Sequence, residues 1–152
     1  MVEGKRRASI WFTRVSVAVV FAMNLSAALG YLFLPMRFAS GYELQGEVGR
    51  IVVQGFGILY LMWNATYPLV IWNPVRHRIV FIIVLIQQLI ALVGESLLIA
   101  SVPAEFGALI RTGARFILFD GAGLLLMAAG FLMVRGVGRP HLSNHDARGL
   151  TH

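Results

Sequence analysis

The sequence contains no cysteine, and only 13% of its residues are charged. Without cysteine the chain cannot form disulfides, thiolate metal sites or thiol-linked haem. Soluble domains are about one-quarter charged, so this chain falls outside their usual composition. Hydrophobic residues make up 58% of the chain, and the mean hydropathy is +0.76. These values indicate a membrane protein with no length left for a soluble catalytic domain.

Four apolar segments occupy most of the 152 residues, and each is long enough for a bilayer crossing of about 20 residues. The first segment has some features of a cleaved signal peptide, but its 25 residues favour a retained span. We therefore predict an all-α, integral membrane four-helix bundle with spans at 10–34, 48–72, 79–101 and 113–134. A basic leader at 1–9 and a polar, disordered tail at 135–152 complete the expected organisation.

Lys and Arg are distributed unevenly between the connections. The leader, the loop at 73–78 and the tail carry most of them, whereas the other connections also carry Glu43, Glu47 and Glu105. Because cytoplasmic loops are rich in Lys and Arg, we expect both termini in the cytoplasm, in a bacterial-type inner (plasma) membrane with lipids as partners. The net charge of +6 then reflects topology, and no basic groove with interleaved aromatic residues indicates nucleic-acid binding.

The second expected span contains a helix breaker near its end. Pro68 lies within its last turns, and a proline there should kink or end the helix because it lacks a backbone N–H. Trp63, Tyr67 and Trp72 surround it, and aromatic residues at such positions are typical of the belt at a membrane interface. We therefore expect an interrupted helix whose far end meets the lipid headgroups.

Polar side chains inside the spans predict a buried polar chamber. Gln88 and Glu95 lie in the third span, and a charge at the centre of a membrane helix costs about 2.5–3.5 kcal/mol on insertion scales. Such a group should face protein or a water-filled cavity, so we expect the third span at the centre of the bundle. At about 1.5 Å of rise per residue, Glu95, Asp120 and Gln54 lie at similar depths. The expected chamber lies in the outer half of the bundle and is lined by Asn24, Arg50, Gln54, Gln88, Glu95, Arg115 and Asp120.

Two interpretations of this cluster remain open. In one, Arg50 or Arg115 pairs with Glu95 or Asp120, and the amide side chains hold the helices together. In the other, the groups line a pocket for an amphiphile or form a protonatable centre, because intramembrane ionisable residues often mark functional sites. In both, the small residues that follow Asp120 should let neighbouring helices approach closely.

Metal and nucleophile chemistry have little support in the sequence. His141, His145 and Asp146 have spacings that metal ligands can have, but they lie in the polar tail without a helix to position them. Serines within the spans have no histidine at membrane depth, so a serine nucleophile with a histidine base is not indicated. We assign no metal and no cofactor.

The stretch Arg50-Ile-Val-Val-Gln-Gly-Phe-Gly57 places an arginine before a glycine-rich second span in a small four-helix membrane protein. In this respect the chain resembles the DoxX-like group. The resemblance implies a compact four-helix membrane bundle that often acts beside a partner enzyme, sometimes one that handles quinone or redox chemistry. It transfers no catalytic residue, and the cysteines of some members are missing here.

The sequence favours a non-enzymatic membrane protein, either an accessory subunit or a binder of a lipid- or quinone-like amphiphile in the outer chamber. Its partner would be another membrane protein or a second copy of the chain. One alternative is a membrane enzyme of the sterol-isomerase type, with Glu95 and Asp120 as acid and base. Another is a small proton-coupled transporter, which would have to dimerise to enclose a path.

Overall fold

The computed structural model describes residues 2–136, which form six α-helices and one short 3-10 helix. The expected all-helical class is confirmed. The long helices are α1 (Val2–Phe33), α3 (Gly46–Asn64), α5 (Arg78–Ala100) and α6 (Gly107–Val134). The short ones are α2 (Pro35–Ala39), η1 (Ser40–Tyr42) and α4 (Tyr67–Trp72).

Among the described helices, α1, α5 and α6 are long and apolar enough to cross a membrane. They also present large apolar side chains on the outside of the bundle, such as Trp11, Leu97 and Leu118. Apolar surface of this extent is unfavourable in water and favourable in a bilayer. The chain therefore has the helices of an integral membrane protein, with lipid around them.

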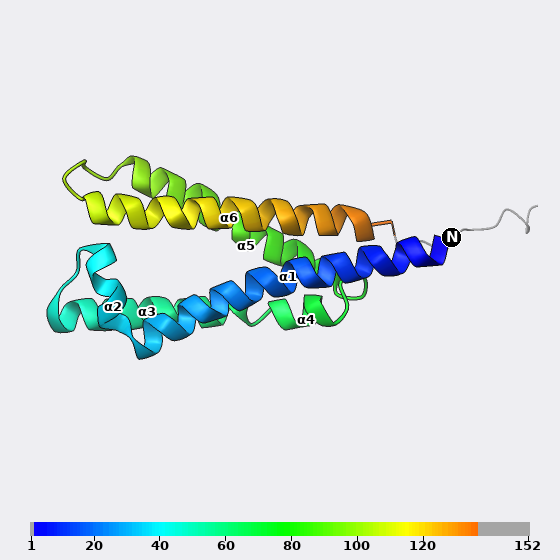
Figure 1. Ribbon diagram of the computed structural model, residues 1–152, viewed down its shortest axis with the longest axis horizontal. Coiled ribbons are helices and arrows are strands. Elements are labelled where there is room, and N and C mark those ends of the chain that lie inside the picture. Colours follow the sequence, from blue (N-terminus) through cyan, green and yellow to red (C-terminus); the bar gives the residue numbers. More distant parts are fainter. Residues whose placement is uncertain (1, 137–152) are drawn as a thin grey trace, which may run out of the picture.

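Helix α1 holds the bundle together (Figure 1). It packs against α3 and α4 on one side and against α6 on the other, while α5 packs on α6 and touches α4. The expectation that the third span, α5, lies at the centre is wrong, because α1 occupies that position. Helix α2 and the α5–α6 connection lie at one end of the bundle, and the N-terminus and the end of α6 lie at the other (Figure 1).

Glycines let α3 and α6 approach the backbone of α1. A Cβ atom on Gly57 would lie 2.8 Å from Leu32 Cγ and 2.9 Å from the Ala28 carbonyl oxygen. A Cβ on Gly130 would lie 3.2 Å from Thr13 Cα, and the Thr13 hydroxyl donates a hydrogen bond of 2.9 Å to the Gly130 carbonyl. In lipid the hydrophobic effect does not drive helices together, so their association depends on the close van der Waals packing that small residues allow. They explain why α1 rather than α5 is central.

The buried face of α6 repeats at intervals of three and four residues, as one side of a helix must. Gly123 and Gly130 belong to it, which confirms the predicted packing role of small residues for these two positions. Ala122 and Ala129 are exposed instead. The face consists of Gly113, Asp120, Gly123, Met127, Gly130 and Val134.

The second expected span is divided into α3 and α4, as Pro68 predicts. Helix α3 ends at Asn64, and α4 begins at Tyr67 with Pro68 in its first turn. Proline is favoured there because the first backbone N–H groups of a helix have no partner within it. The interruption therefore precedes the proline.

Helix α6 begins at Gly107, six residues before the expected start at 113. Glu43 explains the difference, because its Oε1 accepts hydrogen bonds from the backbone N–H of Ala108 at 3.0 Å and of Leu109 at 3.4 Å. An acceptor at a helix N-terminus satisfies donors that the helix itself leaves free. This contact also fixes the connection between α2 and α3 against α6.

The structure describes the predicted N-terminal leader but little of the predicted C-terminal tail. The residues of the basic leader are helical and continuous with the first expected span, because α1 begins at Val2. Of the expected tail, only residues 135 and 136 are described. The candidate metal ligands at positions 141, 145 and 146 therefore lie outside the described residues.

Candidate functional site

Gln88 on α5 is the centre of a buried hydrogen-bond chain that connects three helices. Its side chain is fully buried, and its Nε2 donates to Oδ1 of Asp120 on α6 at 2.8 Å. Its Oε1 accepts a hydrogen bond from the Tyr67 hydroxyl on α4 at 3.1 Å. Asn24 of α1 lies within hydrogen-bonding reach of the same hydroxyl. The chain therefore satisfies polar groups that apolar surroundings would otherwise penalise.

Glu95 lies two turns beyond Gln88 on α5, and its carboxyl group is within hydrogen-bonding reach of the Asp120 carboxyl. Its Oε2 is buried and has no hydrogen-bond partner among residues 2–136. Two carboxylates are both acceptors, so this contact becomes a hydrogen bond only when one of them carries a proton. Glu95 thus has free acceptor capacity that a proton or a ligand can use.

Arg50 does not neutralise these acids. It forms an ion pair with Glu47, one turn earlier on α3, with 2.9 Å between Arg50 Nε and Glu47 Oε2. It also donates to Gln54 Oε1 at 2.8 Å, and Gln54 Nε2 donates to the Leu32 carbonyl on α1 at 3.1 Å. Arg50 and Gln54 therefore belong to the α1–α3 contact and lie apart from the hydrogen-bond chain.

Arg115 lies on α6 but is exposed, and it forms no salt bridge within the described part of the chain. It lines a separate pocket of about 250 Å³ together with Asn24. Within residues 2–136, the interpretation in which Arg50 or Arg115 pairs with Glu95 or Asp120 is therefore wrong.

A cavity of about 350 Å³ lies between α3 and the α5–α6 pair, next to η1. This volume is within the range of small-molecule sites, about 300–1,000 Å³, and such sites usually combine apolar walls with a few polar groups. Most of the wall is apolar or aromatic, and Glu95 supplies its carboxyl group. The lining includes Tyr42, Phe56, Tyr60, Glu95, Leu98 and Phe116.

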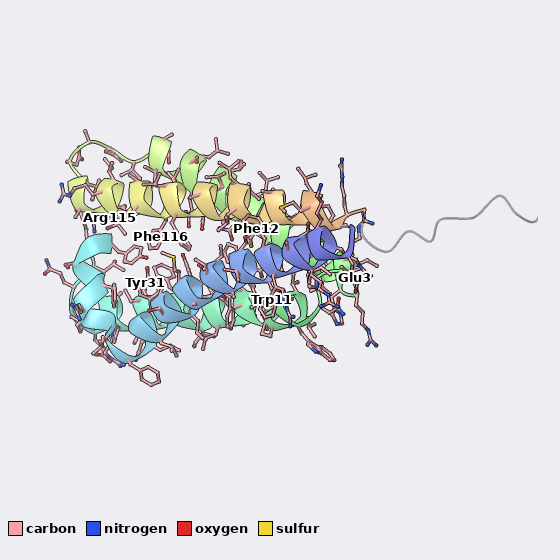
Figure 2. All side chains as sticks on the ribbon, turned by 45° about the vertical axis from the view of Figure 1, so that its right-hand side comes forward. Glu3, Trp11, Phe12, Tyr31, Arg115 and Phe116 are labelled. Carbon is pink, nitrogen blue, oxygen red and sulfur yellow. The ribbon has the colours of Figure 1, made fainter. Side chains whose placement is uncertain are left out.

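Aromatic rings pack together along this cavity. The ring centroid of Tyr42 is 5.2 Å from that of Phe56 and 6.5 Å from that of Phe116. The Tyr42 and Tyr31 hydroxyls are hydrogen-bonded at 2.8 Å. Figure 2 shows Tyr31 and Phe116 at the end of the bundle that carries α2. Burial and the hydrogen bond to Tyr31 raise the pKa of Tyr42, so its hydroxyl remains a neutral donor and acceptor.

The acids of this site could be predicted from the sequence, but its tyrosines were not predicted. Of the four tyrosines of the chain, two line the cavity, one is hydrogen-bonded to a lining tyrosine, and one belongs to the hydrogen-bond chain of Gln88. Tyr67, expected at the membrane interface, is fully buried. A signal was present, because tyrosine hydroxyls inside apolar spans need partners. The four residues are Tyr31, Tyr42, Tyr60 and Tyr67.

Metal binding finds no support in the described residues, where no group of three or more His, Asp or Glu side chains could hold an ion. Comparisons of the chain with protein-family models, curated proteins and solved structures give no match. The similarity to the DoxX-like group stays a prediction. The site is therefore interpreted from its own chemistry.

Proposed function

We propose that the protein is a non-enzymatic integral membrane protein that binds a small amphiphilic molecule in the cavity between α3 and the α5–α6 pair. Glu95 is the observation that carries this proposal. Its carboxyl group lies at the wall of a mainly apolar and aromatic cavity, and its buried Oε2 has no hydrogen-bond partner among residues 2–136. An ionisable group at membrane depth is costly, so such groups usually serve a binding or transport role.

The proposal includes a four-pass topology with both termini in the cytoplasm, in which α3 and α4 together form the second crossing. The distribution of charge along the bundle supports this orientation. The end that carries η1 has arginines balanced by Glu43, Glu47 and Glu105. Basic residues predominate at the other end, as the positive-inside rule requires of the cytoplasmic side. They are Lys5, Arg6, Arg7, Arg14, Arg76, Arg78 and Arg135.

In this orientation the cavity lies in the outer half of the bundle. A lipid or quinone-like molecule, as the similarity to the DoxX-like group implies, would fit its apolar walls. Binding beside a partner enzyme, as an accessory subunit, is compatible with the same site. Membership of that group and a bacterial-type plasma membrane location are parts of this proposal.

Filling the cavity tests the proposal. Leu109 lines the cavity, so Leu109→Trp should exclude a bound molecule. Leu118→Trp is the matched control, because Leu118 is on the same helix and 75% exposed. Native mass spectrometry of protein released from its own membranes should detect a bound amphiphile in the wild type and in Leu118→Trp but not in Leu109→Trp. The same bound molecules in all three proteins would contradict the proposed site.

The contact between the two carboxyl groups favours a second candidate, a membrane isomerase. A carboxyl pair that holds one proton can supply both the acid and the base of a proton shift. Asp120→Asn should then abolish turnover of a bound substrate while leaving its binding in place. Binding without any conversion by the wild type would count against this candidate.

A further inference from the structure

We propose that the ligand of the cavity is an organic ammonium ion, that is, a protonated amine attached to an aromatic or alkyl body. This inference rests on the proposed function, in which the cavity binds an amphiphile. It adds the charge and the chemical class of the polar group that the cavity recognises.

The charges at the cavity select against anions. Glu95 is on the wall, Asp120 contacts it, and no Lys, Arg or His side chain of the described residues contributes to the lining. A carboxyl pair that holds a single proton still carries one negative charge. An anionic headgroup would lie against this charge unpaired, whereas a cation would neutralise it, and buried charges need such partners.

The aromatic rings of the wall strengthen the same preference. Tyr42, Phe56, Tyr60 and Phe116 line the cavity together with Glu95. The face of an aromatic ring attracts a cation within about 6 Å of its centroid, and the attraction increases when the site excludes water. Ammonium groups are commonly recognised by aromatic rings combined with a carboxylate. The cavity offers both.

The carboxyl group of Glu95 favours a ligand that carries a hydrogen-bond donor. Its Oε2 is buried and has no partner in residues 2–136. A protonated amine can donate a charge-assisted hydrogen bond to the Glu95 carboxylate on the cavity wall, whereas a quaternary ammonium has no N–H to donate. Apolar side chains such as Leu98, Ile99 and Leu109 then surround the body of the ligand. The same ammonium chemistry occurs in free amines and in the headgroup of phosphatidylethanolamine.

A matched pair of probes tests the inference. N,N-dimethylbenzylamine is protonated at neutral pH, and isobutylbenzene has nearly the same shape without charge. Binding is measured by saturation-transfer NMR with the full chain in phosphatidylglycerol nanodiscs, with Leu109→Trp used to subtract partitioning into lipid. The wild type should bind the amine at least about tenfold more tightly, which corresponds to about 1.4 kcal/mol. Glu95→Gln should abolish this preference.

Glu105→Gln is the charge-matched control, because Glu105 is exposed at the same end of the bundle and does not line the cavity. It should keep the preference for the amine. Phe116→Leu gives a second test in case Glu95→Gln does not fold, and it should weaken binding of the amine more than that of isobutylbenzene.

The outcomes separate the two proposals. Equal binding of both probes by the wild type would overturn the ammonium inference and leave the proposed function intact. Failure of both probes to bind, with no difference between the wild type and Leu109→Trp, would overturn the proposed function as well. Adding phosphatidylethanolamine distinguishes the sources of an ammonium group: displacement of the amine assigns the site to the headgroup, and retention assigns it to a free amine.

Discussion

Replacing Gln88 by leucine tests how strongly the buried hydrogen-bond chain stabilises the bundle. Leucine has a similar size, so the main effect is to leave the Tyr67 hydroxyl and Asp120 Oδ1 without their partner. An unsatisfied buried polar group costs about 1–3 kcal/mol. The Tyr67 hydroxyl can still use Asn24, which lies within its reach. We therefore count one unsatisfied group and expect the free energy of unfolding to fall by about 2 kcal/mol.

This magnitude exceeds the average hydrogen bond between membrane helices, which contributes only about 0.6 kcal/mol. The difference follows from burial, because Gln88 is 0% and Asp120 only 6% exposed, so no headgroup or water can replace the lost donor. Unfolding in mixed micelles of increasing sodium dodecyl sulfate content measures the change.

Gln87→Leu is the matched control for this experiment. Gln87 is adjacent on the same helix but only half-buried, and its contact with the Thr66 hydroxyl is long, at 3.5 Å. Its replacement should change stability by less than about 0.5 kcal/mol. Equal effects of the two substitutions, or a loss at position 88 below about 0.6 kcal/mol, would refute the reasoning.

Three further predictions concern packing, capping and topology. Gly57→Ala should lower the free energy of unfolding by about 1–3 kcal/mol, because the added Cβ would overlap α1. Gly55→Ala, which has open space around it, should leave the free energy of unfolding unchanged or raise it by up to about 1 kcal/mol. Equal denaturation midpoints for the two variants would contradict the close α1–α3 contact. Glu43→Ala should cost about 0.5–2 kcal/mol through loss of the α6 cap, and Glu43→Gln should lose less in thermal unfolding because an acceptor remains. A reporter fused after Arg78 should be cytoplasmic and one within residues 38–47 external, and the reverse pattern would overturn the proposed orientation.

Helix boundaries could be predicted where the sequence itself contains the end signal. The third span was expected at 79–101 and the structure has α5 at Arg78–Ala100, because a long apolar run is bounded there by polar residues. Pro68 likewise revealed the interruption of the second span. The start of α6 at Gly107 could not be predicted, because Glu43, which caps it, is more than sixty residues away in the sequence.

The candidate site was predicted in part for a similar reason. Counting helical rise from the span ends placed Glu95 and Asp120 at one depth, and the structure brings them into contact. The depth of a residue in the membrane does not determine with which charged group a long arginine side chain forms an ion pair. Arg50 contacts Glu47 and Gln54 on its own helix, where they are neighbours at three and four residues. Among the described residues, these local contacts leave the deeper acids without an arginine.

The polar first turns of α3 have a consequence for biosynthesis. Unlike α1, α5 and α6, α3 is not apolar enough to be identified as a span, and Glu47, Arg50 and Gln54 lie near its start. On the proposed topology, the insertion machinery would release such a segment into lipid poorly, since charged and polar residues lower the hydrophobicity on which release depends. Helix α1 emerges from the ribosome first and offers α3 the Leu32 carbonyl and a surface that fits Gly57. We expect the two to enter the bilayer as a hairpin, with the earlier helix acting as the template for the later one.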